Sequence, residues 1–526
     1  MCFAGNANYA GSSDSVGFSI EEARESRPRG GRAMAPAPVG PATVPRARYR
    51  PRDGRTRQML DPNALTHHRD LVERRASVGE RVAAGKRLRK TVPRRAHGEF
   101  QPAIARDPLR VLETENVPRL PGLVPVRTAR MLVSPFAFLR GGAGIMAADL
   151  APTPTTGITV QACGDMHLSN FGFFGSAERN LIFAINDFDE TLPGPWEWDL
   201  KRLVASVAVC ARHLGGDAAT VESVARAAVE SYRTRMQEYA ELGYLATWYA
   251  RIDEQLVLDA APPEMRAAAE SIMTKARRHT HLQVLGKLTD LIDDRRRILE
   301  EPPLVVRETV TSTGRPIAEA VDLFLRSYLP SLSADRRSLL ARYRIVDVAR
   351  KVVGVGSVGT RCWVVFMEGS SEGDPLFLQV KEANASVLAP YVSVRRSVRP
   401  GRRVVDGQRL IQGAPDIFLG WGEQDGMHFY VRQLRDMKGG VEFTPERSTP
   451  GLPGVHEYIR LCGWALALAH AKSGDAAMIA GYVGRSDAMD EALAAFALAY
   501  ADQTERDHQA LVAAVQSGRF EAATGL

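Results

Sequence analysis

The sequence of 526 residues contains little cysteine and no long apolar run. Its cysteines are odd in number, and no two of them are separated by two residues: Cys2, Cys163, Cys210, Cys362 and Cys462. This distribution argues against a disulfide framework and against a cysteine zinc site, and it favours a reducing cytoplasm. Because no run of about 18 apolar residues occurs, we expect no membrane-spanning helix. Residues 1–20 also lack the basic and then apolar layout of a secretory signal.

Positive charge is in excess only near the start of the chain. Of the net charge of +7, +5 falls in residues 1–60, where ten arginines stand against five acidic residues. The same segment is rich in Pro, Gly, Ala and Ser, so we predict that residues 1–62 form a disordered basic tail. The rest of the chain is nearly neutral and gives no support for a nucleic-acid partner. An arm that binds nucleic acid or a membrane surface is the alternative for the tail.

The pattern of apolar residues predicts an α+β fold. It is largely helical over residues 63–342, strand-rich over residues 343–440, and helical again over residues 441–526. Within the first of these segments, "WEWDLKRLVASVAVCARHLGG" predicts a strong helix, and we expect helices to continue over residues 217–300. The apolar Trp196 and Trp198 are expected to enter the core where that helix begins.

Polar residues gather between two predicted strands. "GITVQACGD" predicts a strand that runs into the loop "CGDMHLSN", and "NLIFAIND" predicts a strand that ends at Asp187. Asn170 and Asp187 offer the oxygen ligands that Mg²⁺ prefers, and Asp165 beside them would accept a proton from a hydroxyl group. An Asp-x-x-x-x-Asn loop followed by a second metal-binding Asp is the spacing of kinase chemistry. A turn whose polar side chains cap the backbone is the alternative.

A glycine motif lies in the strand-rich segment. Gly354, Gly356 and Gly359 form a G-x-G-x-x-G pattern, which in a dinucleotide site opens a helix. Here "RCWVVFM", a turn and "LFLQVKEA" follow, and these predict strands. A glycine-rich hairpin leading to a strand with Lys381 at its centre is the layout of a kinase ATP-binding lobe. The alternative for Lys381 is a solvated strand lysine.

These motifs resemble the protein-kinase-like superfamily, most closely the aminoglycoside- and choline-type phosphotransferases. Those enzymes carry an HGD-x-H-x-x-N loop, a strand that ends in a metal-binding Asp, and a Gly-Pro-x-x-x-Asp-Leu helix start. This chain has "CGDMHLSN", "INDFDE" and "GPWEWDLKRL" in that order. Over roughly residues 80–515 it is also similar to a bacterial family called domain of unknown function 2252, whose members share "SPFAFLRG", "NDFDE" and "EWDLKRL".

The resemblance implies a phosphotransferase that uses ATP and Mg²⁺ and acts on a hydroxyl group, on a small-molecule acceptor that the sequence does not identify. AMP transfer and a nucleotide-binding pseudokinase or regulatory protein are the alternatives. In the implied site, Asp165 is the catalytic base, Asn170 and Asp187 are the metal ligands, and Asp199 braces the loop. The residues implied to contact ATP are Lys381, which also acts in catalysis, together with Gly354, Gly356, Ser357, Gly359 and Arg140.

Three departures from the kinase pattern affect what we expect. Cys163 replaces a loop histidine, and the acidic partner of Lys381 is not evident, with Asp406 as our candidate. The catalytic loop also precedes the glycine motif by about 190 residues, which implies a circularly permuted two-lobe kinase-like fold. The helix "LCGWALALAHAKSG" would then pack beside the loop. "HAKSGD", from His470 to Asp475, is an alternative catalytic loop that would restore the usual order.

The other polar residues near these motifs have simpler interpretations. His167 is expected to be structural. Asp189 and Glu190 are expected to lie in a solvated turn or to cap a helix, with a second Mg²⁺ site as the alternative. Arg140 has a structural alternative in a packed loop formed by "SPFAFLRGG". His279 and His281, two residues apart on a predicted helix, make a poor metal pair.

Deletion of residues 1–60 should change neither the melting temperature nor the affinity for ATP, because a segment of this composition contributes no packed surface. Thermal denaturation and ATP titration of the full and shortened chains check this. A large loss of either property would show that the basic segment belongs to the fold or to the site.

Overall fold

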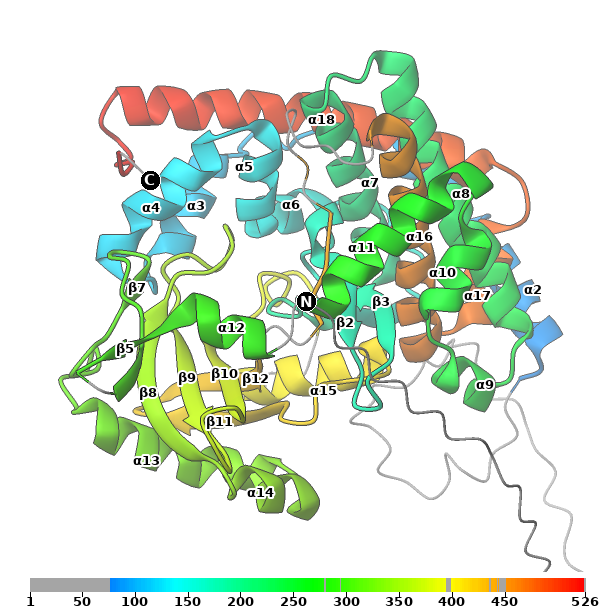
Figure 1. Cartoon of the computed structure of the whole chain (residues 1–526). Helices are drawn as coiled ribbons and strands as arrows, with labels where there is room; N and C mark the ends of the chain where they lie inside the picture. Colours follow the sequence, from blue (N-terminus) through cyan, green and yellow to red (C-terminus); the bar gives the residue numbers. More distant parts are fainter. Residues whose placement is uncertain are drawn as a thin grey trace, which may run out of the picture. The chain divides into compact units, whose positions relative to one another are not determined.

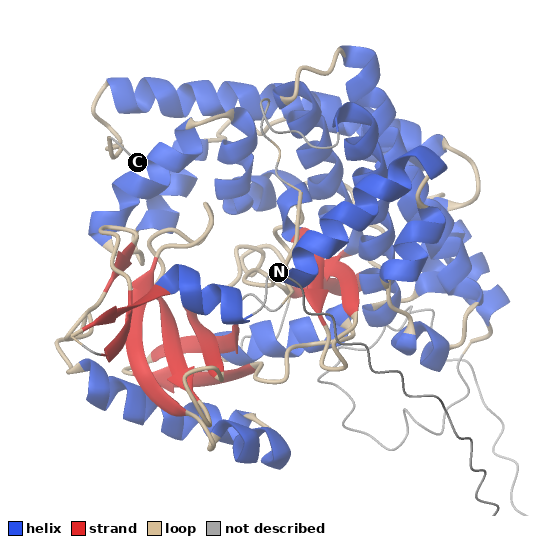
Figure 2. Ribbon diagram, viewed as in Figure 1, coloured by secondary structure: helices blue, strands red, loops and turns tan. Residues whose placement is uncertain are grey.

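The computed structural model describes residues 76–278, 281–293, 295–393, 399–434, 437–441, 443 and 451–524. The tail predicted for residues 1–62 and His279 lie outside these residues. The described chain is α+β, with one six-stranded sheet and three two-stranded sheets, all antiparallel, among many helices (Figure 2). No helix in this part of the chain combines the length and the apolar character that crossing a bilayer requires.

Helices form the first part of the described chain. They are α2 (Val78–Leu88), η1 (Arg94–Gly98), α3 (Pro108–Asn116), η2 (Pro121–Leu123), α4 (Val124–Leu132), α5 (Pro135–Gly141) and α6 (Ala143–Leu150). Ser77 and Glu80 form a capping box at the start of α2. Ser134 caps α5, whose first residue is a proline, so "SPFAFLRGG" begins a helix and not the packed loop that was the alternative.

Two short strand pairs carry the predicted polar residues. The strands are β1 (Thr159–Ala162), β2 (Phe171–Gly175), β3 (Leu181–Ile185) and β4 (Leu192–Pro195). β1 pairs with β4, and β2 pairs with β3 in a hairpin. The polar loop, residues 163–170, joins β1 to β2, and the acidic segment, residues 186–191, joins β3 to β4. Since Ala162 pairs with Leu192 and Phe171 with Ile185, these two connections run side by side.

The predicted "WEWDLKRL" helix follows directly. α7 (Trp196–His213) is buried along most of its length, and Trp196 and Trp198 lie in the core as expected. α8 (Ala218–Glu241), capped by Asp217, packs against α7. The two helices form the centre of the largest hydrophobic cluster, which also takes in the strand pairs that flank the polar loop.

The helices expected over residues 217–300 end at Leu288. A hairpin of β5 (Thr289–Ile292) and β6 (Arg295–Ile298) follows, because Ile298 packs under the large sheet with Val284 and this contact outweighs the helical pattern of the charged sequence. The other elements here are α9 (Tyr244–Tyr249), α10 (Glu254–Ala260), η4 (Pro263–Met265), α11 (Arg266–Arg278), α12 (His281–Leu288), β7 (Val305–Val306), α13 (Ile317–Tyr328), η5 (Leu329–Ser331) and α14 (Ala334–Leu340).

The strand-rich segment forms the six-stranded sheet, in the order β11–β12–β10–β9–β8–β7. The edge strand β7 precedes residue 343, and the others are β8 (Arg344–Lys351), β9 (Cys362–Glu368), β10 (Pro375–Glu382), β11 (Gly420–Gln424) and β12 (Met427–Gln433). α13 and α14 cover one face of this sheet and α12 covers part of the other (Figure 1). The central strand β10 is consequently buried along its whole length.

Four helices complete the described chain. α15 (Pro400–Gln412) lies against β11 and β12, and it is followed after the sheet by α16 (Gly451–Ser473), α17 (Ala476–Val483) and α18 (Ala488–Gln516). α16 packs on α8 and contacts β1 and β3, while α18 packs on α7. α17 packs on α2, so segments close to the two ends of the sequence share one interface.

Glycine at position 85 permits the close approach of α2 and α17, since a Cβ there would lie 2.0 Å from the carbonyl oxygen of Met478. Gly85→Ala should therefore lower the free energy of unfolding by about 1–3 kcal/mol, because backbone must move to make room. Gly79→Ala in the same helix is the matched control. Its Cβ would meet nothing within 4 Å, so it should be neutral or stabilising by up to about 1 kcal/mol. Thermal denaturation compares the two, and equal melting temperatures would contradict the close packing.

Candidate active site

One face of α7 fixes the polar loop. Asp199, Arg202 and Ser206 are spaced at i, i+3 and i+7, which places them on the same side of the helix. The Asp199 carboxylate accepts hydrogen bonds from the first two backbone N–H groups of the loop, at 2.6 and 2.9 Å. Ser206 Oγ accepts a bond from the N–H of Leu168 at 3.1 Å. The second loop residue, Gly164, has a φ of +82°, and a Cβ there would lie 2.6 Å from the carbonyl oxygen of Glu190, so this position requires glycine.

Asp165 is held by a charge from the same helix face. Arg202 donates to Asp165 Oδ1 through Nε at 2.8 Å and also through Nη2. The other oxygen, Oδ2, lies 3.7 Å from His167 Nε2, and a Cβ on Gly356 would lie 3.9 Å from it. Burial lowers the pKa of His167 to about 3 although Asp165 opposes this, so the imidazole is neutral at pH 7. Asp165 thus directs one oxygen toward the glycine motif.

Antiparallel pairing brings Asn170 and Asp187 together. Asn170 precedes β2 and Asp187 follows β3, so both lie at the same end of the hairpin, where the N–H of Asn186 donates to the carbonyl of Asn170 at 2.8 Å. Asn170 Nδ2 donates to the carbonyl oxygen of Asp165 at 2.5 Å. Asp187 Oδ1 is buried and accepts no hydrogen bond from a described residue. The three predicted loop residues therefore form one group.

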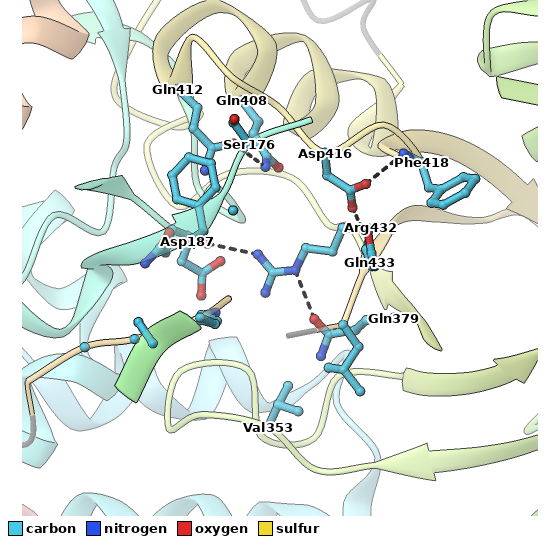
Figure 3. A pocket seen from close by; sticks show the side chains of 18 of the residues that line it. Ser176, Asp187, Val353, Gln379, Gln408, Gln412, Asp416, Phe418, Arg432 and Gln433 are labelled. Atoms are coloured by element: carbon cyan, nitrogen blue, oxygen red, sulfur yellow. Dashed lines mark hydrogen bonds between the residues drawn. The ribbon is translucent and has the colours of Figure 1, made fainter. Parts of the chain in front are cut away.

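Cations from the rest of the chain surround Asp187. Burial acts to raise the pKa of its carboxyl group, but Lys381, Arg432 and Lys438 outweigh burial and hold the pKa below its usual value. Arg432 lies between Asp187 and Gln379 (Figure 3), and it donates to the carbonyl of Asn186 at 2.9 Å and to Gln379 Oε1 at 3.0 Å. Asp187 is therefore a carboxylate at neutral pH.

Lys381 meets the acidic segment directly. Its side chain, on the last residue but one of β10, is buried, with 1% of the residue exposed. Nζ donates to Asp189 Oδ2 at 2.5 Å and lies 3.6 Å from Asp187 Oδ1. Burial acts to lower the pKa of Lys381, but the two carboxylates outweigh it and hold the pKa well above the usual value. The lysine is thus a buried cation paired with residues almost 200 positions away in the sequence.

The glycine-rich segment, residues 353–360, is anchored through its carbonyl groups. Arg119 donates to the carbonyls of Gly356 and Val358, at 2.7 and 2.5 Å, and Arg130 donates to that of Gly354 at 2.5 Å. The N–H groups of residues 354–357 donate to no other described residue. With its carbonyls occupied and these amides unpaired, the segment can accept an anion from the cavity side.

A large cavity joins these elements. Its volume is about 1580 Å³, and its wall includes the polar loop, the acidic segment, β10 and the glycine-rich segment. Seven cationic side chains and three carboxylates contribute to the wall, namely Arg140, Arg179, Lys275, Lys351, Lys381, Arg432, Lys438, Asp187, Asp374 and Asp416. The excess of positive charge favours a polyanionic ligand.

The arrangement coincides with the region matched by one protein family. The family described as "Uncharacterized protein conserved in bacteria (DUF2252)" matches residues 119–514. The chain belongs to this family. The matched range contains the polar loop, the acidic segment, the glycine-rich segment and Lys381, and it confirms the expected membership. Searches of curated proteins and of solved structures return no match.

Most of the residues proposed for the site in this DUF2252 protein lie around the cavity. Those that line it are Arg140, Asn170, Asp187, Gly354, Ser357 and Lys381. Asp165 and Gly356 lie next to each other behind the wall. Gly359, with a φ of +89°, packs instead against the side chain of Arg119, so in this structure it shapes the turn and does not line the cavity.

Arg140 is a cation without an anionic partner among the described residues. Its buried Nε–H donates no hydrogen bond to a described residue, and the guanidinium lies over the Phe136 ring, with Cζ 5.9 Å from the ring centroid. Burial lowers the pKa of Arg140, and nearby Asp165 opposes this effect. An anionic group bound in this part of the cavity would therefore meet an available guanidinium beside the candidate base.

Two expectations about acidic residues are wrong. Asp406 does not pair with Lys381, because its side chain faces away on α15 and binds Arg402 at 3.0 Å. Asp189 lies in a turn, as expected, but its carboxylate is only partly exposed and caps no helix, since it binds Lys381 together with Ser357 and Tyr430. Glu190 is also engaged in the turn, where it accepts a bond from the N–H of residue 387.

The alternative loop "HAKSGD" has structural roles. His470 lies within α16, fully buried, and its ring nitrogens face Tyr232 (2.8 Å) and Asp199 (3.4 Å). Asp475 caps α17 and pairs with Arg81 at 2.8 Å. α16 does pack beside the polar loop, where Tyr458 OH lies 3.0 Å from the carbonyl oxygen of Leu168 in the loop and 3.0 Å from that of Phe171, the first residue of β2.

Sequence reasoning missed Arg202, Arg432 and Tyr430. Helical spacing could have identified Arg202, because it lies three residues after Asp199 and must face the same loop. Tyr430 and Arg432 lie two residues apart on β12. The register of β12 against β10 pairs Tyr430 with Lys381 and Arg432 with Gln379. No local signal specifies that register, so these two residues could be found only from the fold.

Glu190→Gln should raise the melting temperature at pH 8 and leave it almost unchanged near pH 4.5. Burial raises the pKa of Glu190 from 4.5 to about 7, with Arg403 and the N–H of Val387 opposing and Asp189 and Asp165 adding to the rise. Because the folded-state pKa is raised, the stability of the protonated form is present below pH 4.5 and lost as the pH rises to about 7.

Melting curves between pH 4.5 and 8 check this expectation. Glu178→Gln is the control, because a hydrogen bond from Ser176 lowers the pKa of Glu178, the opposite of the shift at Glu190. The melting temperature of this variant should not exceed that of the wild type at pH 8. A difference in melting temperature between Glu190→Gln and the wild type that is the same at every pH would contradict the raised pKa of Glu190.

Proposed function

We propose that this protein is an ATP- and Mg²⁺-dependent phosphotransferase that acts on a hydroxyl group of a small molecule. The cavity and the residues next to its wall have the side chains that this chemistry needs: the carboxylate of Asp165 as a base, oxygen ligands for a metal, and cations for a triphosphate. The acceptor itself is not specified by these residues.

One observation supports the proposal most directly. Lys381 and Asp187 are far apart in the sequence, yet both line one cavity. Lys381 Nζ lies 3.6 Å from Asp187 Oδ1. The resemblance to kinases requires these two groups to serve one nucleotide, which means that they must lie within roughly 10 Å of each other.

The residues present fit a magnesium ion bound with a nucleotide. Asp187 Oδ1 is buried without a hydrogen-bond donor, and Asn170 is beside it at the end of the hairpin. No group of three or more His, Cys, Asp or Glu side chains able to hold a metal occurs among the described residues. Asn170 and Asp187 would therefore hold Mg²⁺ together with phosphate oxygens, as Mg²⁺ sites of kinases do.

The positive groups fit the phosphates of ATP. Lys381, Arg140, and Gly354 and Ser357 of the glycine-rich segment line the same cavity. Such fixed charges and dipoles need no rearrangement when negative charge redistributes in the transition state. Mg²⁺, when bound, would supply further neutralisation of the leaving diphosphate.

In the proposed transfer, the acceptor oxygen forms a bond to the γ-phosphorus while the bond from that phosphorus to the bridging oxygen of ADP breaks. Asp165 Oδ2, the oxygen not bound by Arg202, accepts the proton of the hydroxyl group. Arg202 fixes the orientation of the Asp165 carboxylate, which suits a loose transition state in which orientation of the hydroxyl matters more than its early deprotonation.

The proposal includes a two-lobe kinase-like fold in permuted order. The six-stranded sheet with α15 would be the nucleotide lobe, and the helices around the polar loop would be the large lobe.

Incubation with ATP labelled at either the γ- or the α-phosphate tests the reaction class. We expect label from the γ-phosphate to enter a protein-free extract of bacterial small molecules, only with Mg²⁺ present, and not with the Asp187→Asn variant. Transfer of the α-label would establish AMP transfer instead. Absence of both transfer and ATP binding would refute the proposal.

Lys381→Ala and Asp187→Ala should each lower kcat/KM by about 10²-fold or more, because both groups stabilise one transition state. Their combination should lower it by far less than the product of the two effects. Circular dichroism verifies that each variant is folded. Fully multiplicative losses would indicate that the two residues serve separate sites.

A further inference from the structure

The helix that follows the Lys381 strand offers the lysine no acid. Asp406 is the single acidic residue of α15, and it pairs with Arg402 away from the cavity. The side of α15 toward the acidic segment carries Arg403, which donates to the carbonyl of Asp189 at 2.7 Å and to that of Asn384 at 2.8 Å. α15 thus presents a cation where the kinase pattern expects a carboxylate.

Asp189 instead binds three donors of the sheet region. Its Oδ2 accepts from Lys381 Nζ at 2.5 Å and from Ser357 Oγ at 3.1 Å, and its Oδ1 accepts from Tyr430 OH at 2.6 Å. These donors belong to β10, to the glycine-rich segment and to β12. The Asp189 carboxylate therefore links β10, the glycine-rich segment and β12 to the acidic segment, which also contains Asp187.

The charge balance explains why a second carboxylate is needed. Lys381 is almost fully buried, and a buried ammonium without a partner is strongly destabilising. If Asp187 binds a metal, its charge is shared with that ion and is less available to the lysine. Asp189, two residues later, leaves the lysine paired in both situations.

We propose that Asp189 is a positioning residue of the nucleotide site, which holds Lys381 and the glycine-rich segment in the geometry that a triphosphate requires. This inference rests on the nucleotide-binding function proposed above. It assigns to the acidic segment the role that kinases give to an acid of the first small-lobe helix.

Hydrogen exchange of the full-length protein without nucleotide tests the positioning role. Asp189→Asn should accelerate exchange of residues 353–360 and 375–382 by about tenfold or more, because the buried charge pair is lost. Asp406→Asn is the matched control and should exchange as the wild type does. Asp189→Glu, which retains the charge, should restore most of the protection.

Affinity for MgATP, measured by calorimetric titration, supplies a readout that a merely structural role would not change. At temperatures where each variant is folded, Asp189→Asn should bind MgATP about tenfold or more weakly, whereas Asp406→Asn should bind within about twofold of the wild type. Wild-type exchange and affinity in Asp189→Asn would overturn the inference.

The two proposals can fail separately. If the wild type binds no MgATP but Asp189→Asn still exchanges faster in the two segments, the proposed function fails and Asp189 remains only a link between elements. If Asp189→Asn does not fold, Tyr430→Phe replaces it, because this variant removes one of the three donors. Faster exchange of residues 353–360 in Tyr430→Phe would support the inference, and unchanged exchange would overturn it.

Discussion

The buried ammonium of Lys381 is the group on which the rest of the arrangement depends. It lies in the central strand of a sheet covered on both faces, where a lone positive charge would be strongly disfavoured. The carboxylates that neutralise it, Asp187 and Asp189, come from a connection almost 200 residues earlier. Two halves of the sequence must therefore meet for this charge to be tolerated, and the cavity forms where they meet.

A second set of contacts gives the site its shape. Asp199, Arg202 and Ser206 use one face of α7 to hold the polar loop, and Arg119 and Arg130 hold the glycine-rich segment by its carbonyls. Both connections are thus fixed by hydrogen bonds within the protein itself. Electrostatic catalysis needs polar groups that are held in place in advance. These contacts therefore favour the proposed phosphotransferase site over the alternative in which the polar side chains of the loop only cap the backbone.

Local signals were sufficient for the motifs and for their immediate surroundings. The strand before the polar loop and the "WEWDLKRL" helix follow from the pattern of apolar residues, and the structure has both. The brace by Asp199, which the resemblance to phosphotransferases implied, is also present. β2 was overlooked because "FGFFG" is short and contains glycine. The β5–β6 hairpin was read as helix because its charged residues suit a surface helix.

Long-range pairings could not be predicted in the same way. The partner of Lys381 was sought on the following helix, at Asp406, because a kinase would have it there, whereas this DUF2252 protein uses Asp189. Arg432 and Tyr430 depend on the register of β12 against β10, which no short segment of sequence determines. Burial on both faces of β10 likewise depends on α12 and α13, which lie outside the strand-rich segment.

The central claim is that the cavity binds a nucleotide together with a metal, and the melting temperature with ATP in the presence and absence of Mg²⁺ tests it most directly. At a concentration about 100 times the dissociation constant, MgATP should raise the melting temperature by about 2–5 °C. ATP with a chelator should give a clearly smaller rise, because Asp187 then has no ion to bind. Equal melting temperatures with MgATP, with ATP alone and without nucleotide would contradict the account.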